Sequence, residues 1–145
     1  MIKVLGIDHI NLVVEDVEEG MRFWNDLLGI ELKNIEEKPR LDIKSCRTRE
    51  RGEPVKESDI TPCLVVYEPL TPDGPEARSL AKKGEGVTVV VFAVESIKDA
   101  IEHFKARGIV PFLASETSAL FPPRDTHGVR VMLIEGWGYR KGLDK

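Results

Sequence analysis

The histidines and cysteines are the first side chains to consider for metal binding or proton transfer, and the sequence has three histidines and two cysteines. Cys46 and Cys63 share no CxxC spacing, so we expect small apolar residues of a reduced compartment and no thiol metal site. His103 falls within a helical pattern, and His127 lies in an Asp-Thr-His-Gly turn. His9 stands in a strand pattern and is therefore the main candidate for metal or acid–base chemistry.

The strand around His9 fixes the direction in which its side chain points. Residues 9–16 read His-Ile-Asn-Leu-Val-Val-Glu-Asp, an apolar run typical of a β-strand. Successive strand side chains alternate between two faces, so His9 shares a face with Ile7, Asn11 and Val13. The opposite face is apolar throughout and would meet a helix. We therefore expect His9 on the face of the sheet that the helix leaves open.

An internal repeat supplies the elements that position this strand. Residues 89–96 repeat the pattern of residues 9–16 at an offset of 80, ending in Val-Glu-Ser where the first copy ends in Val-Glu-Asp. An amphipathic helix pattern follows each copy. Asp16 and Ser96 stand where helix N-caps belong, so we expect structural roles for both. The order strand, helix, three strands then occurs twice.

The remaining elements follow from apolar runs and turn residues. Further strands are expected at 31–36, 41–49, 60–68, 109–113, 116–121 and 129–135, and a short helix at 76–83. We expect one domain, 1–145, with a repeat unit at 5–68, a linker at 69–85, a second unit at 86–136 and a tail at 137–145. The charge-dense stretch 36–59 is interpreted as a solvated hairpin and loops.

Composition excludes several classes of protein. The chain has 145 residues and a net charge of −4, with a pI near 5.5, which argues against nucleic-acid binding. No apolar run approaches the ~20 residues that a membrane span needs. The N-terminus carries no secretory hydrophobic stretch. We therefore expect a cytoplasmic protein with neither nucleic-acid nor membrane partners.

The repeat resembles the vicinal oxygen chelate superfamily, which includes glyoxalase I, extradiol dioxygenases and bleomycin resistance proteins. Residues 68–75, 80–87 and 126–129 are locally most similar to methylmalonyl-CoA epimerases. The resemblance implies an α+β fold in which two tandem βαβββ modules form a cup-shaped, curved mixed sheet. It also implies a divalent metal in the cup, held from four positions on the first and last strands of the modules, and a homodimer.

Matching this chain to those four positions gives an unusual set of side chains. The first position is His9, the second is Val65, the third is Val89 and the fourth is Met132. Valine has no lone pair, and a thioether is a soft ligand that suits a hard divalent site poorly. One histidine does not hold a catalytic ion, because such sites use about three protein ligands. We therefore expect no metal and no cofactor.

The cup wall without a metal is apolar with a few polar groups, as small-molecule pockets are. The expected pocket residues are His9, Asn11, Val65, Tyr67, Val89, Val91, Arg130 and Met132. Arg130 either grips a carboxylate or phosphate in the cup or is a solvated arginine at a strand edge. Arg47 and Arg49 either add positive charge at the mouth of the pocket or belong to a solvated face, and the acids around them favour the solvated face. For His9 the sequence places no partner carboxylate, which favours ligand contact over catalysis.

Three functions stay open at this point, and the sequence does not decide whether the protein is an enzyme. The first is a small-molecule-binding protein that has lost most of the metal site. The second is a metal-dependent epimerase, isomerase or lyase similar to methylmalonyl-CoA epimerase or glyoxalase I. The third is a structural or regulatory dimer with a filled cup. Trp137 and Tyr139 follow the last strand as exposed-looking aromatics, which adds to the expectation of a homodimer.

Overall fold

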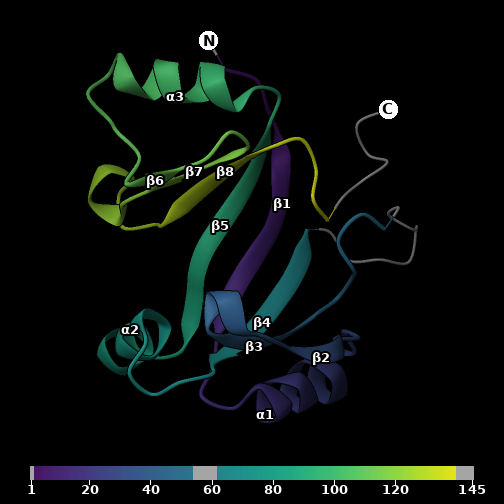
Figure 1. Cartoon of the computed structure of the whole chain (residues 1–145). Helices are drawn as coiled ribbons and strands as arrows, with labels where there is room; N and C mark the ends of the chain where they lie inside the picture. The colour runs from purple at the N-terminus through teal and green to yellow at the C-terminus, as the bar shows by residue number, and fades with distance from the viewer. Residues whose placement is uncertain (1, 54–61, 140–145) are drawn as a thin grey trace.

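The computed structural model describes residues 2–53 and 62–139, and its eight strands form one mixed sheet (Figure 1). The first half contains β1 (Val4–Val13), α1 (Val17–Arg22), β2 (Lys33–Lys38), β3 (Ile43–Arg47) and β4 (Cys63–Pro69). A linking helix, α2 (Pro75–Lys83), leads to β5 (Gly86–Val94), α3 (Ile97–Lys105), β6 (Leu113–Ala114), β7 (Ser118–Phe121) and β8 (Val131–Glu135). The strand order is β2-β3-β4-β1-β5-β8-β7-β6. This is the predicted fold of two tandem βαβββ modules.

The register at the centre of the sheet relates the two modules by an approximate twofold axis. β1 runs antiparallel to β5, with His9 opposite Val91, Ile10 opposite Val90 and Asn11 opposite Val89. Ile10 therefore faces its own repeat counterpart, 80 positions along the chain, while His9 and Asn11 each face the counterpart of the other. β1 also pairs in parallel with β4, as β5 does with β8. The offset of 80 is confirmed, while the bounds of the repeat units and the linker stay predictions.

The helices begin where the capping residues predict. The Asp16 carboxylate accepts the backbone N–H groups of Glu18 and Glu19, and the Ser96 hydroxyl accepts that of Asp99. After α1 the chain changes to a π-helical turn over Phe23–Leu27. Because the wider turn rotates later residues off the buried stripe, Leu28 is exposed.

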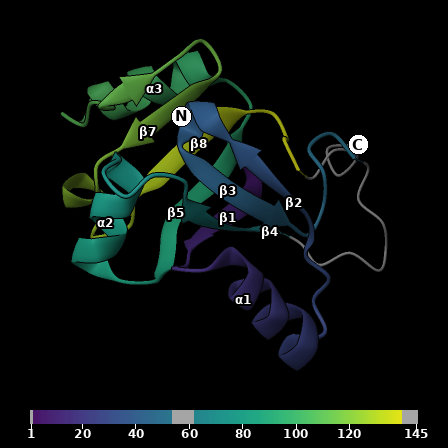
Figure 2. The same ribbon diagram turned by 60° about the horizontal axis from the view of Figure 1, so that its bottom comes forward.

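Two apolar clusters fix α1 and α3 against the same face of the sheet. Val17 of α1 packs with Leu32, Cys46 and Val66, and partly buried Leu12 and Val14 join them. The second cluster, beneath α3, consists of Val94, Ile97, Ala100, Ala119, Phe121 and Leu133. In Figure 2, α3 and α1 lie at opposite ends of the curved sheet, and α2 lies beside the start of β5. Side chains of β1 that alternate with Leu12 and Val14, His9 among them, consequently lie on the other face.

The strand predictions fail most clearly after α3. The strand expected at 109–113 is present only as the short β6, because Pro111 lacks the N–H that a ladder needs and Ile109 packs against the α3 cluster. Most other strands lie within about two residues of their expected bounds, as is usual for element ends. The linker helix is confirmed at Pro75–Lys83. The start of the strand expected at 60–68, and residues 54–59 of the charge-dense stretch, lie outside the described residues.

No helix among residues 2–53 and 62–139 is long and apolar enough to cross a membrane.

Candidate functional site: a cavity around His9

A cavity of about 940 Å³ opens on the face of the sheet away from α1 and α3. Both modules contribute to its walls. The predicted pocket residues that line it are His9, Asn11, Val65, Tyr67, Val89, Arg130 and Met132. Val91, also predicted, is fully buried and is not among the lining residues. It lies between His9 and Met132 at the centre of the sheet, where neighbouring side chains cover it.

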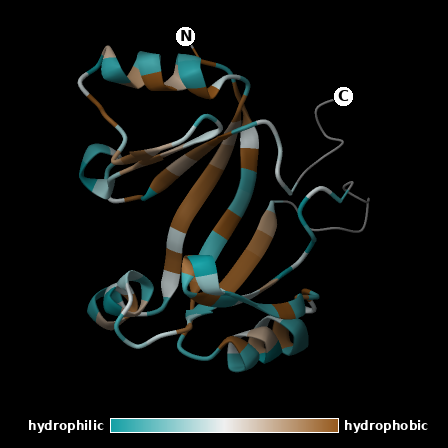
Figure 3. Ribbon diagram, viewed as in Figure 1, coloured by the Kyte–Doolittle hydropathy of each residue, from teal (hydrophilic) through white to brown (hydrophobic). Residues whose placement is uncertain are grey.

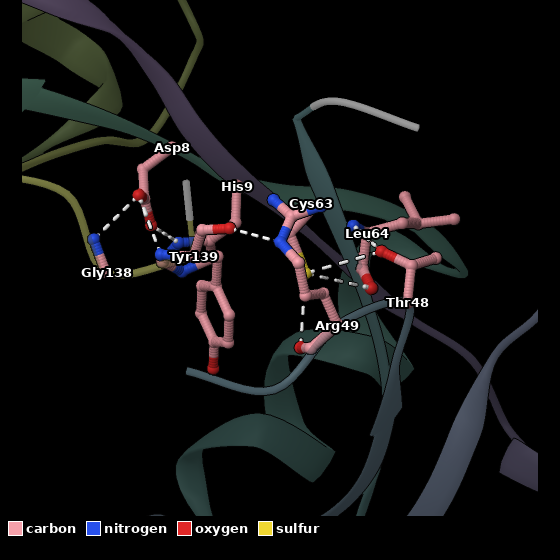
Figure 4. A network of polar contacts seen from close by, with 8 residues as sticks. All are labelled: Asp8, His9, Thr48, Arg49, Cys63, Leu64, Gly138 and Tyr139. Carbon is pink, nitrogen blue, oxygen red and sulfur yellow. Dashed lines mark hydrogen bonds and ion pairs between the residues drawn. The ribbon is translucent and has the colours of Figure 1, made fainter. Parts of the chain in front are cut away.

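The Asp8–His9 pair is the most constrained polar feature of the cavity (Figure 4). Asp8 Oδ2 lies 2.7 Å from His9 Nδ1, and Asp8 Oδ1 accepts the backbone N–H groups of Gly138 and Tyr139 at 2.8 and 2.9 Å. Burial alone would raise the pKa of Asp8, but these hydrogen bonds outweigh it and hold the pKa below its ordinary value. The ionised Asp8 carboxylate accepts a hydrogen bond from Nδ1–H, so the neutral ring presents the lone pair of Nε2.

The expectation that His9 has no carboxylate partner is wrong, and a β-bulge explains why. In the β1–β5 ladder Ile7 faces Phe92 and His9 faces Val91, so Asp8 is an extra residue without an opposite partner. Strict alternation would place Asp8 on the opposite face from His9, whereas the bulge lets its carboxylate reach the ring. The sequence signal that could have revealed the pair is the adjacency of the two residues.

The segment after β8 closes one side of the cavity. Tyr139 is buried, and its ring centre lies 4.7 Å from that of His9 in an edge-on arrangement. The Arg51 guanidinium lies over the Tyr139 ring, and Arg49 Nε donates to the Tyr139 carbonyl. Trp137 lines the cavity. The interpretation of Trp137 and Tyr139 as exposed aromatics is therefore wrong, and the homodimer stays a prediction without them.

The assignment of Arg47 and Arg49 to a solvated face is also wrong, because both are buried. Arg47 Nη2 donates to Ser45 Oγ at 2.8 Å, and Arg47 Nη1 lies 3.8 Å from Glu36 and 3.6 Å from Glu50. The acids that suggested a solvated face instead pair with the guanidinium, and such pairing is what allows arginine to be buried. Arg47 lines the cavity, in line with the alternative interpretation that it adds positive charge to the pocket.

Tyr67, near the end of β4, belongs to a second network of polar contacts. Its hydroxyl donates to Glu76 Oε1 of α2 at 2.8 Å and lies 2.9 Å from Thr88 Oγ1. Burial, with a smaller contribution from the Glu76 carboxylate, raises the pKa of Tyr67 despite opposing effects of Thr88 and Arg130. Tyr67 is therefore a neutral phenol that ties α2 to the sheet.

The four positions at which the superfamily resemblance implies metal ligands come together in this cavity. His9 and Val89 are related by the repeat, and so are Val65 and Met132, because Asn11 pairs with Val65 as Val91 pairs with Met132. Only His9 offers a donor that suits a hard divalent ion. Within residues 2–53 and 62–139, no three His, Cys, Asp or Glu side chains are grouped so as to hold a metal ion. The donors at these positions do not fit the metal.

Comparisons with known proteins agree with the fold. A model of the Glyoxalase/Bleomycin resistance protein/Dioxygenase superfamily matches residues 6–133. Uncharacterized protein YqjC of Bacillus subtilis is 26% identical over 141 residues, which are 91% of this chain and 93% of that protein. The crystal structure of methylmalonyl-CoA epimerase from Mycobacterium tuberculosis gives a TM-score of 0.73 at 19% identity, covering 91% of this chain and 88% of that one. A hypothetical protein from Bacillus halodurans gives a TM-score of 0.73 at 24% identity, covering 90% and 93%.

Two paired βαβββ modules around a shared cavity define the vicinal oxygen chelate class of proteins, as the sequence repeat predicted. The chain belongs to the Glyoxalase/Bleomycin resistance protein/Dioxygenase superfamily. The two solved structures support the fold alone, because they are less than 25% identical to this chain.

Proposed function

We propose that this protein binds a small molecule in the cavity around His9 without a metal ion. The observation that carries the proposal is the set of side chains at the four symmetry-related positions. His9 lies in one cavity with Val65, Val89 and Met132, and these three offer apolar surface where hard donors would be needed. A cavity of about 940 Å³ with apolar walls and a few fixed polar groups has the size and composition of a ligand pocket.

The Asp8–His9 pair supports a polar contact with the ligand. With Nδ1 held by Asp8, Nε2 is the ring nitrogen left without a partner among the described residues. Its lone pair accepts a hydrogen bond from a ligand hydroxyl or amide. The carboxylate fixes both the tautomer and the orientation of the ring, so this acceptor is preorganised.

A metal-dependent isomerase or epimerase is the second candidate, and one observation favours it. Metal-bound histidines usually donate their second ring N–H to a carboxylate, as His9 does to Asp8. The three other ligand positions weigh against this candidate. The third hypothesis, a dimer whose cup is filled by its own side chains, is disfavoured by the volume of the cavity.

Titration of EDTA-treated protein with 1-naphthoate, a bicyclic aromatic acid small enough for the cavity, tests the proposal. We expect saturable one-site binding that equimolar Zn²⁺, Mn²⁺ or Co²⁺ leaves unchanged. Val89→Trp fills the cavity and should abolish binding, whereas Val87→Trp, at an exposed site of the same strand outside the lining, should not. Failure of the native protein to bind 1-naphthoate and its phosphate and amide analogues alike, or binding that requires a metal, would overturn the proposal.

A further inference from the structure

We infer that Arg130 is the anion-binding group of the cavity, so that the ligand is a small organic anion carrying a carboxylate or phosphate. This inference rests on the proposed binding function and narrows its ligand class. Arg130 lies directly before β8 and lines the cavity, where it is half-buried. Its carbonyl oxygen accepts the backbone N–H of Val90 at 3.1 Å, so its backbone is tied to the central strand β5.

The guanidinium of Arg130 makes no hydrogen bond and no ion pair with the residues that the structure describes. The other basic groups of the cavity are engaged. Arg47 lies within ion-pair distance of Glu36 and Glu50, Lys38 lies 3.5 Å from Glu36, and Arg51 covers the ring of Tyr139. Arg130 is thus a partly desolvated cation whose five N–H donors have no protein acceptor in the described part of the chain.

The acidic residues that line the cavity do not neutralise Arg130. Glu36 and Glu50 lie beside Arg47, and Asn34 also donates to Glu50. Glu135 accepts the backbone N–H at the start of α3, and Glu76 accepts the Tyr67 hydroxyl. The positive charge of Arg130 also acts on a group that lines the cavity, because it opposes the rise in the pKa of the buried Tyr67 phenol.

These contacts define the chemistry of the ligand. A planar guanidinium with free donors recognises carboxylate and phosphate oxygens through paired, charge-assisted hydrogen bonds. The apolar walls at Val65, Val89 and Met132 accept a hydrocarbon body. His9 Nε2 accepts a hydrogen bond from a donor group elsewhere on the molecule.

Three probes with the same ring system test the inference: 1-naphthoate, 1-naphthyl phosphate and the neutral 1-naphthamide. Calorimetric titration of the full-length protein should give a Kd for at least one anion that is about tenfold or more below that of the amide. Arg130→Gln should remove this preference while leaving the amide affinity unchanged, and Arg130→Lys should retain part of it. Arg124→Gln, which removes an exposed arginine outside the cavity, is the matched control and should behave as the native protein.

The outcomes separate the two proposals. A preference for naphthoate assigns a carboxylate ligand, and a preference for the phosphate assigns a phosphate ester. Equal affinity of the native protein for anions and amide, or an unchanged preference in Arg130→Gln, would overturn the role of Arg130 and leave the cavity as a binding site. Failure of all three probes to bind the native protein would overturn the proposed function and this inference with it.

Discussion

The two modules share one backbone arrangement, but the central strand of the first module carries polar side chains and that of the second is mostly apolar. In the ladder between β1 and β5, the residues without an opposite partner include Asp8 on β1 and Thr88 on β5, which are repeat counterparts. Asp8 holds His9, whereas Thr88 contacts Tyr67 and precedes Val89. Figure 3 shows the same contrast, with hydrophilic segments interrupting β1 and an almost wholly hydrophobic β5.

The contrast extends beyond the central strands. Among the described residues, the buried polar or charged side chains all belong to the first module: Asp8, His9, Ser45, Arg47, Thr48 and Arg49. The cluster beneath α3 in the second module is apolar throughout. A repeat that preserves strand register therefore leaves side-chain chemistry free to diverge, and here the first module carries most of the site. The second module contributes apolar wall and Arg130.

The largest effect on stability is expected from the apolar module. Phe121 is fully buried and packs edge-on against Phe104, with ring centres 4.6 Å apart. Phe121→Ala should lower the free energy of unfolding by about 4 kcal/mol in urea titrations, through lost burial and a cavity. Phe112→Ala, at a half-exposed site in the same module, should cost less than about 1 kcal/mol. An equal loss of unfolding free energy in the two variants would mean that the α3 cluster does not dominate the stability of the second module.

The next largest effect should come from the polar module. Asp8→Ala leaves the N–H groups of Gly138 and Tyr139 and the His9 ring without their acceptor, at a cost of about 3 kcal/mol. Thr88→Ala, at the repeat counterpart, loses weaker neutral hydrogen bonds and should cost about 1 kcal/mol. Similar costs in the same urea titrations would show that the two bulges are energetically alike.

Acid should weaken the native fold through Asp8. Because its pKa is held below the ordinary value in the folded protein, Asp8 stabilises the fold above that ordinary value, and the stabilisation is lost as the pH falls through the folded pKa. The free energy of unfolding of the native protein should therefore decline more steeply below about pH 4 than that of Asp8→Asn. Parallel pH profiles for the two proteins would contradict the assignment.

The smallest expected effect concerns Tyr67. Tyr67→Phe removes the hydrogen bonds to Glu76 and Thr88 and should cost about 1 kcal/mol. Since the pKa of Tyr67 is raised, its phenol should remain protonated near pH 10, where an ordinary tyrosine is half ionised. Ultraviolet difference spectra of native protein and Tyr67→Phe should therefore agree at that pH. A tyrosinate band present only in the native protein would contradict this network.

The repeat made the fold predictable, because a strand that ends in Val-Glu-Asp or Val-Glu-Ser before an amphipathic helix has few alternatives. Strand alternation placed His9 on the open face of the sheet, and the repeat made Val89 its counterpart. The other two ligand positions, Val65 and Met132, came from the superfamily resemblance. Most of the residues expected to line the pocket do so. Pro111 is the clearest local signal against a strand at 109–113. The apolar residues around it led to the prediction of a strand that the structure shows only as the short β6.

The parts of the site that could not be predicted depend on departures from regular geometry or on contacts between distant residues. The bulge at Asp8 breaks the alternation that sequence reasoning assumes. Arg47 is buried because Glu36 and Glu50 come to it across a hairpin and a turn, which no local charge pattern reveals. Tyr139 reaches His9 only when the chain after β8 folds back along β1, 131 residues from Asp8 in sequence.

The metal content of the purified protein tests the central claim most directly. Elemental analysis of the native protein and of His9→Ala should find no stoichiometric divalent metal in either. The triple substitution Val65→Glu, Val89→His and Met132→Glu restores donors around an Asp8-held His9 and should bind about one divalent ion per chain. About one zinc, nickel, cobalt or manganese ion per native chain, lost in His9→Ala, would contradict the account and favour the metal-dependent isomerase.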